Sequence, residues 1–291
     1  MMIELLFYAV FLSQIFLLSI YYPKKIIERN LYVLNTYPAA KYPKLYLNSY
    51  FADPEKAIKR GLRRFAVMNG IIAIFGLGIL ASMAVSGYLP STIKENENLI
   101  FVMFFFALQM VPHLLSELST WRWYKLMREA RAETIRTADL KPRLLFDFIS
   151  PVYVALAVSL YVGWLVFYIY IHREATPWAW NQYVSIFTIT AVNLLFVFTV
   201  FRFLRGQKID PYQASQDRQK HIGAVIKSHV YGSIGMSLFL ILMELVNVYH
   251  LDKFEPVFLG GFLQVMAVVG LGTMLRSINV KDIDFSVYKE A

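Results

Sequence analysis

Cysteine is absent from the 291 residues, and charged residues make up only 17% of them. The lack of cysteine excludes disulfides, a cysteine nucleophile, iron–sulfur ligation and cysteine-based zinc sites. In a soluble domain, roughly a quarter of all residues are charged and about 45–50% are apolar. In this chain, 57% of the residues are hydrophobic. A bilayer can bury the long apolar runs of this sequence, which a soluble core of this size cannot absorb.

The motifs of common enzyme classes are also missing. The sequence has no Walker motif, no nucleophile elbow and no HExxH, and no aspartate lies deep in an apolar run. None of the five histidines forms a pair at the four-residue spacing of a helical metal site. We therefore predict no catalytic residue and no metal site, and the sequence identifies no cofactor. A protein that is not an enzyme is favoured.

Seven long apolar segments are what the sequence has in abundance. Each is close to the roughly 20 residues that an α-helix needs to cross a hydrocarbon core about 30 Å thick. The segments lack the apolar–polar alternation of barrel strands. We therefore predict an all-α integral membrane protein, a polytopic bundle of about seven transmembrane helices in a single domain over residues 1–291. The predicted spans are residues 3–21, 65–89, 99–118, 149–171, 183–203, 230–248 and 257–275.

Basic residues lie almost entirely in alternate connections. Of the 29 lysines and arginines, 26 lie in residues 22–64, 119–148, 202–229 and the segment after Leu275. Because basic residues collect on the cytoplasmic side of membrane proteins, the N-terminus is predicted outside and the C-terminus in the cytoplasm. The first segment, followed by its basic cluster, is expected to be an anchor and not a cleaved signal peptide. The net charge of +9 is then explained by the basic residues on the cytoplasmic side of the membrane. We therefore do not expect nucleic acid as a partner.

Residues 22–64 form the longest predicted cytoplasmic segment. Two tyrosine–proline pairs, at residues 37–38 and 42–43, favour extended backbone, so an irregular, folded-back loop is expected. Asp53, followed by proline, is typical of the N-cap of a helix. A basic amphipathic helix is expected to run from there through Arg64 along the membrane surface and into the second span.

Ionisable and amide side chains inside the predicted spans are expensive in lipid, so they are the candidate functional residues. In the third span Gln109, His113 and Glu117 are spaced four apart and share one helical face, beside Pro112. Glu244 lies in the outer half of the sixth span, whereas His113 lies in the inner half of the third. The candidate pathway or binding residues are Gln109, His113, Glu117, Asn193, Glu244 and Gln264.

These residues have two interpretations. A proton or cation that crosses lipid needs carriers or ligands at successive depths, and histidine and carboxylates supply them. Amide side chains also link helices through hydrogen bonds worth about 0.6–2 kcal/mol each. For Gln109, Asn193 and Gln264 the packing interpretation is the stronger one. For His113 and Glu244 the two interpretations are balanced.

The leading functional hypothesis is a small membrane transporter or channel-like protein that moves a proton, ion or small solute through a polar seam in the bundle. The second is a non-catalytic subunit or scaffold of a membrane protein complex, which presents its basic loops to a partner or to anionic lipid. The third is a lipid- or quinone-binding membrane protein. Expected partners are the lipid bilayer and either a second copy of the chain or a membrane-complex partner. The expected location is a prokaryotic inner (plasma) membrane.

The topology can be tested with two inserted tags. A tag within residues 172–180 is expected outside and a tag within residues 206–226 in the cytoplasm, because basic residues are sparse in the first segment and frequent in the second. Labelling by a membrane-impermeant reagent, before and after lysis, measures both positions. Two tags in the same compartment would show that the predicted topology is wrong.

Overall fold

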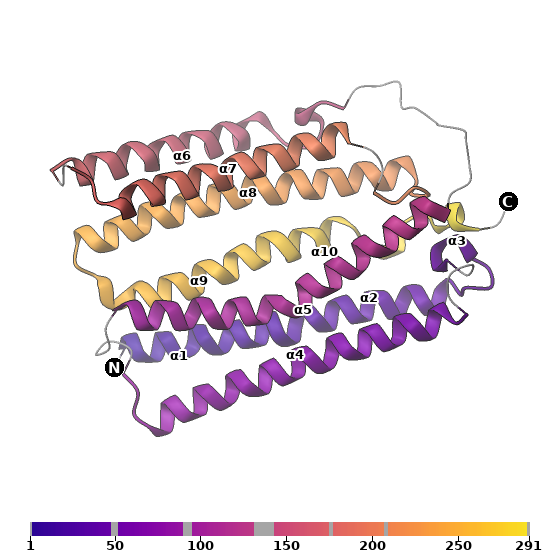
Figure 1. The fold of residues 1–291 in the computed structure, drawn as a ribbon, viewed down its shortest axis with the longest axis horizontal. Helices are drawn as coiled ribbons and strands as arrows, with labels where there is room; N and C mark the ends of the chain where they lie inside the picture. Colours follow the sequence, from indigo (N-terminus) through magenta and orange to yellow (C-terminus); the bar gives the residue numbers. More distant parts are fainter. Residues whose placement is uncertain are drawn as a thin grey trace.

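The computed structural model describes residues 2–47, 52–89, 95–130, 143–174, 177–206 and 209–289. These residues contain no β-strand, and seven of their helices are long and apolar enough to cross a membrane. The long helices run side by side along one common direction (Figure 1). The prediction of an all-α polytopic bundle is confirmed, and the chain is a multi-pass membrane protein.

The first and last spans each contain a π-helical turn. The first span consists of α1 (Met2–Ile15), the π turn η1 (Phe16–Tyr21) and α2 (Tyr22–Thr36). The last consists of α9 (Glu255–Ala267), the π turn η6 (Val268–Gly272) and α10 (Thr273–Ser277). The other spans are α4 (Pro54–Val85), α5 (Glu95–Ala130), α6 (Pro151–Ile171), α7 (Trp180–Arg205) and α8 (Ser215–Val248), and the short α3 (Pro43–Tyr46) precedes α4.

The segment between the first two spans is more helical than the sequence suggested. The expected irregular loop begins only after Thr36, because α2 continues the first span. Asp53 is the N-cap of α4, and its carboxylate accepts a hydrogen bond of 2.9 Å from the backbone N–H of Lys56. The basic stretch is then part of one 32-residue helix and not a separate surface helix. Extending an existing helix avoids the cost of nucleating a second one, which explains both differences.

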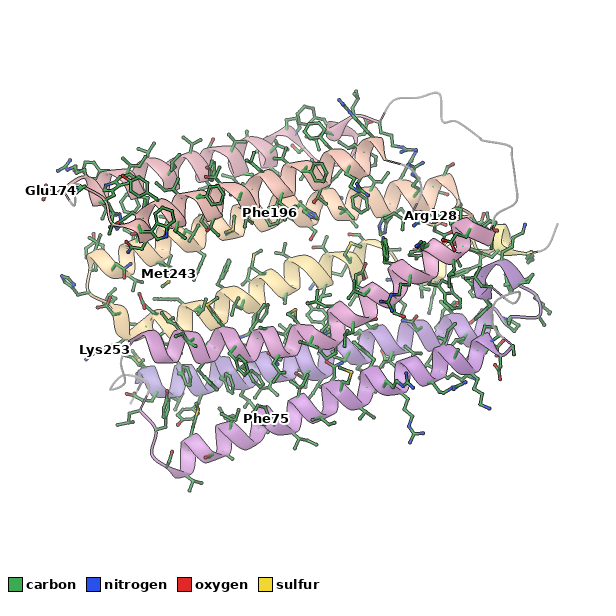
Figure 2. The ribbon with its side chains drawn as sticks, viewed as in Figure 1. Phe75, Arg128, Glu174, Phe196, Met243 and Lys253 are labelled. Carbon is green, nitrogen blue, oxygen red and sulfur yellow. The ribbon has the colours of Figure 1, made fainter. Side chains whose placement is uncertain are left out.

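The connections gather at two opposite ends of the bundle (Figure 1). Glu174 and Lys253 mark one end, and Arg128 marks the other (Figure 2). The connection before α4, the connection before α8 and the C-terminal segment lie at the end of Arg128, which we call the basic end. The two chain termini lie toward different ends, as an odd number of crossings requires.

The spans form two groups. The four-span group contains the first span, α4, α5 and the last span, whereas the three-span group contains α6, α7 and α8 (Figure 1). α8 contacts the last span and thereby joins the groups. Gly232 and Gly235 of α8 face Met266 of α9, and a Cβ on either would lie 3.5 Å from that side chain. This distance is ordinary van der Waals contact, so the two groups pack against each other here without a steric need for glycine.

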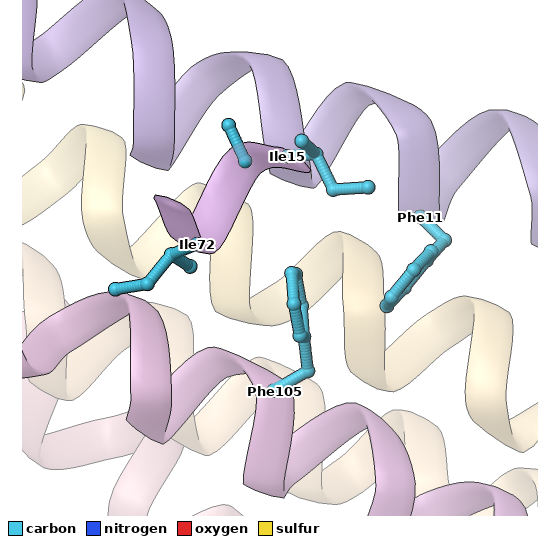
Figure 3. Packing of buried hydrophobic residues seen from close by; sticks show 5 residues of the cluster. Phe11, Ile15, Ile72 and Phe105 are labelled. Carbon is cyan, nitrogen blue, oxygen red and sulfur yellow. The ribbon is translucent and has the colours of Figure 1, made fainter. Parts of the chain in front are cut away.

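Aromatic packing against a glycine holds the four-span group together. The buried side chains that meet there are shown in Figure 3: Phe11, Ile15, Ile72 and Phe105. The ring centroids of Phe11 and Phe105 are 4.9 Å apart. A Cβ on Gly76 of α4 would overlap the Phe105 ring, so glycine makes this approach possible. Because lipid provides no hydrophobic driving force between helices, such close contact is what stabilises the group.

Segments from distant parts of the chain fold together at the basic end. We call them the cap: residues 37–47, 209–217 and 278–289. The rings of Tyr37 and Phe285 stack with their centroids 4.0 Å apart, and the Tyr288 hydroxyl donates a 2.5 Å hydrogen bond to Asp210. Tyr46 donates to the Tyr37 carbonyl at 2.7 Å. Burial raises the pKa of Tyr46 to about 12, so this hydroxyl keeps its proton at ordinary pH.

Hydrogen bonds attach the cap to the helices. The indole N–H of Trp123 on α5 donates to the Leu45 carbonyl at 3.3 Å, and Arg128 donates to the Ile209 carbonyl at 2.7 Å. The buried carboxylate of Asp217 on α8 accepts the backbone N–H of residue 284 at 2.9 Å. The cap therefore connects helices of both groups at the basic end.

Replacing Gly76 with alanine is expected to destabilise the protein by about 1–3 kcal/mol, because the buried Phe105 ring must move out of its packed position. Gly78→Ala is the matched control on the same helix, since nothing lies within 4 Å of its added Cβ. The control should change stability by less than about 1 kcal/mol, in the stabilising direction. Thermal unfolding in detergent measures both variants. Equal effects would contradict the assignment of Gly76 as a contact site.

Candidate functional site

The six predicted polar residues are divided between the two helix groups. Those of the four-span group are Gln109, His113 and Glu117 on α5 and Gln264 on α9; those of the three-span group are Asn193 on α7 and Glu244 on α8. Gln109 and His113 are buried, whereas Glu117 is exposed. Asn193, Glu244 and Gln264 are half-buried. The two groups have to be considered separately.

A proline determines the backbone of the first span. Pro23 has no N–H and therefore cannot donate to a carbonyl in the preceding turn. The chain forms the π turn Phe16–Tyr21 just before it, and the N–H of Tyr22 bonds to the Leu17 carbonyl five residues back. In this π register the partner of the Leu18 carbonyl would be residue 23, which has no proton to donate. The π turn thus needs a donor from elsewhere.

His113 of α5 supplies that donor. Its Nε2 atom lies 3.2 Å from the Leu18 carbonyl oxygen, and because a carbonyl only accepts, Nε2 carries the proton in this contact. Phe65 meets the imidazole ring edge to face, with centroids 5.4 Å apart. An unsatisfied carbonyl in lipid costs several kcal/mol. His113 therefore completes the hydrogen bonding of the first span.

Gln109 binds the same stretch of the first span, one turn of α5 away from His113. Its side-chain oxygen accepts a 2.9 Å hydrogen bond from the side-chain amide of Gln14. Its side-chain N–H groups donate to the Ser19 hydroxyl at 2.9 Å and to the backbone carbonyl of Gln14 at 3.3 Å. All three side chains are buried. This network links α5 to the end of α1 and to the π turn itself.

Gln264 links the last span to the first. Its amide N–H donates to the Val10 carbonyl at 3.0 Å, and its carbonyl accepts from the Ser13 hydroxyl at 2.9 Å. Like Gln109 and His113, it has interhelical hydrogen bonds that explain its presence in lipid. A role for these three residues in a pathway stays a prediction.

Hydroxyl and amide groups join the helices of the three-span group near mid-membrane. Ser233 of α8 donates a 2.6 Å hydrogen bond to the Asn193 side chain on α7. Tyr161 of α6 and Thr190 of α7 have their oxygens 2.7 Å apart. The interface of α6, α7 and α8 is therefore polar at this depth.

An aromatic column continues this interface along α6 toward the end opposite the basic end. Tyr161, Trp164, Tyr168 and His172 are spaced three or four apart, so they share one helical face. The centroids of Trp164 and Tyr168 are 5.6 Å apart, and those of Tyr168 and His172 are 4.3 Å apart with the rings stacked. The column leads from the buried Trp164 to the helix end.

Glu244 of α8 lies beside this column. Its carboxylate interacts electrostatically with His172 and Tyr168. The carboxylate therefore lies where α6 packs against α8, and α7 also packs against α8. A carboxylate next to aromatic rings attracts cations, both by its charge and through the negative ring faces.

Two polar atoms deep in the same interface have no hydrogen-bond partner among the described residues. They are the indole nitrogen of Trp164 and the hydroxyl oxygen of Ser237, and both residues are 1% exposed. Leaving a buried polar group unsatisfied costs about 1–3 kcal/mol, and such groups commonly bind water or a ligand. We call this interface the three-span seam, formed by Trp164, Tyr168, His172, Asn193, His229, Ser233, Ser237 and Glu244.

The seam includes residues that the sequence did not single out. His229 lies one turn from Ser233 on α8, and its ring meets Phe196 with centroids 5.3 Å apart. Trp164 and Tyr168 follow a helical spacing that is also typical of plain core packing, so the spacing alone did not mark them. Within the parts of the chain that the structure describes, no group of three or more His, Asp or Glu side chains is placed to hold a metal ion.

Comparisons with protein families, curated proteins and solved structures found no match to this chain. The arrangement of its own side chains is therefore the basis for inferring its function.

A double-mutant cycle on Gln14 and Gln109 tests the network at the π turn. Each single change to leucine should destabilise the protein by about 1–3 kcal/mol, because it leaves the partner amide unsatisfied in a buried site. The double variant should be more stable than the sum of the two changes predicts, by roughly 0.6–2 kcal/mol. Unfolding of the four proteins in detergent measures the coupling. Purely additive effects would contradict the proposed bond.

Proposed function

We propose that this protein is a small membrane transporter or channel-like protein for a proton or small cation, and that the cargo passes through the three-span seam. The observation that supports the proposal is the half-buried carboxylate of Glu244 on α8, which lies beside His172 and Tyr168 at the packed interface of α6 and α8. An ionisable residue within a span is costly and commonly marks an ion or proton pathway. Binding a positive charge would offset that cost.

The residues along α8 suggest an order of steps. Glu244 would take up the cation or proton from the end of the bundle opposite the basic end, with His172 beside it. The next polar residue along α8 is Ser237, seven residues from Glu244. Ser233 and His229 follow at intervals of four residues, each roughly 6 Å along the helix axis. Their hydroxyl and imidazole groups can bind a small cation or relay a proton.

The other predicted residues have different roles in this proposal. Asn193 belongs to the seam through its hydrogen bond with Ser233. Gln109, His113 and Gln264 hold the first span in place, and the exposed Glu117 is assigned no role. The alternation of basic connections supports a cytoplasmic location of the basic end. The membrane that we propose is a prokaryotic inner membrane.

The cap favours a second function, that of a non-catalytic subunit or scaffold of a membrane complex. Its three segments form a defined surface at the basic end, where Lys44 lies over the Tyr212 ring and Lys289 over the Tyr42 ring. Such a surface can bind a membrane-complex partner or a second copy of the chain. Copurification of a stoichiometric partner, together with no flux in the isolated protein, would favour this function.

Flux measurements on Glu244→Gln test the transport proposal. In liposomes that carry a proton or cation gradient, this variant should lose flux by about 100-fold or more, because it removes the charge that binds the cargo. Glu174→Gln is the matched control: the same chemical change at the same end of the bundle, on an exposed residue. The control should retain most of its flux.

Unchanged flux in Glu244→Gln would contradict the proposed route. A thermal unfolding measurement on both variants checks that the loss is not caused by misfolding.

A further inference from the structure

A groove at the basic end of α4 combines exposed arginines with apolar side chains. Its volume is about 360 Å³, and we call it the arginine groove, lined by Arg60, Arg63, Arg64, Val67 and Met68. Arg63 and Arg64 follow Arg60 by three and four residues, so both are neighbours of Arg60 on the helix surface. All three are exposed.

The described residues provide no ion-pair partner for the positive charge of the groove. Within the described residues, none of the ion pairs involves Arg60, Arg63 or Arg64. By contrast, Lys25 at the same end is 3.2 Å from Glu28, and Lys125 is 3.9 Å from Glu129. The arginine groove thus concentrates three charges on a short stretch of helix, and none of them has an ion-pair partner in the part of the chain that the structure describes.

The same helix becomes apolar immediately beyond the arginines. Val67, Ile71 and Ile74 follow on α4 and are 52%, 61% and 72% exposed. At 1.5 Å per residue, Val67 lies about 5 Å beyond Arg64 along the axis and Ile74 about 15 Å beyond it. α4 lies at the margin of the bundle (Figure 1), and Phe75 part-way along it is also exposed (Figure 2). This surface therefore faces lipid.

We propose that the arginine groove is a binding site for an anionic glycerophospholipid. The guanidinium groups would bind the phosphate, for which their planar fork of N–H donors is well suited. The acyl chains would lie along Val67, Ile71 and Ile74. This occupant matches both halves of the surface, whereas a free phosphate would use only the charged half. The site is on the four-span group and is independent of the three-span seam.

The test uses the full-length protein in neutral detergent, titrated with phosphatidylglycerol or with phosphatidylcholine of the same acyl chains. Bound lipid is counted by native mass spectrometry. Phosphatidylglycerol should bind at least about ten-fold more tightly, and Arg60→Gln, Arg63→Gln and Arg64→Gln combined should weaken its binding about 100-fold, from roughly five-fold per basic residue near a membrane surface. Equal binding of the two lipids would overturn the proposal.

The matched control removes the same charge elsewhere at the basic end: Lys24→Gln, Lys25→Gln and Lys125→Gln combined. It should change phosphatidylglycerol binding by less than about three-fold, because these lysines already pair with glutamates. An equal loss in the control would show that only net charge matters and would overturn the site.

Two further measurements separate the remaining explanations. Glycerol 3-phosphate carries the phosphate without acyl chains, so binding as tight as that of phosphatidylglycerol would overturn the lipid assignment. Arg60→Lys, Arg63→Lys and Arg64→Lys combined keep the charge, and with it the membrane orientation, but lose the planar fork. This variant should bind phosphatidylglycerol more weakly than the wild type. Unchanged binding would overturn the role assigned to the guanidinium groups.

Discussion

No water reaches a free carbonyl in the lipid interior, and the first span contains such a carbonyl because Pro23 has no N–H to donate. The π turn and the contact from His113 to the Leu18 oxygen satisfy this requirement. Gln109 binds the backbone and the serine next to it. The first span contacts α4, α5 and α9. The missing proton of Pro23 is thus matched by a contact that joins α5 to the first span.

The candidate polar side chains of the two helix groups have different neighbours. In the four-span group, the amides of Gln109 and Gln264 bind specific partners on the first span, which is how polar residues hold helices together in lipid. In the three-span group, Trp164 and Ser237 have polar atoms without a partner among the described residues, and Glu244 carries a carboxylate. In the four-span group, the side-chain oxygens of Gln14 and Asn69 also lack a partner among the described residues. We place the proposed pathway between α6, α7 and α8 because the half-buried carboxylate of Glu244 lies there, beside His172 and Tyr168.

The basic end combines two kinds of surface. In the cap, lysines lie over tyrosine rings, and aspartates accept hydrogen bonds from the C-terminal segment. On α4, by contrast, the arginines are exposed and are followed directly by apolar residues. In a bilayer, the phosphate layer lies next to the hydrocarbon core. The arginines of α4 suit the phosphate layer, and the apolar residues that follow them suit the hydrocarbon core.

The sequence by itself determined the seven spans, the separation of basic from sparse connections and the start of α4 at Asp53. Each of these depends on local properties, because segment length, hydropathy and a helix cap do not require knowledge of neighbouring helices. The sequence also named Gln109 and Glu244 as unusual, since their cost in lipid is independent of the fold. It did not separate their roles.

Only the tertiary structure decided that Gln109 meets Gln14 while Glu244 meets His172 and Tyr168. It also decided that α2 continues the first span and that the C-terminal segment joins the cap. The physical reason is that all apolar helix faces are alike to lipid, so hydropathy does not indicate which faces become neighbours. That choice depends on shape, as at Gly76 and Phe105, and on hydrogen bonds between residues about a hundred positions apart.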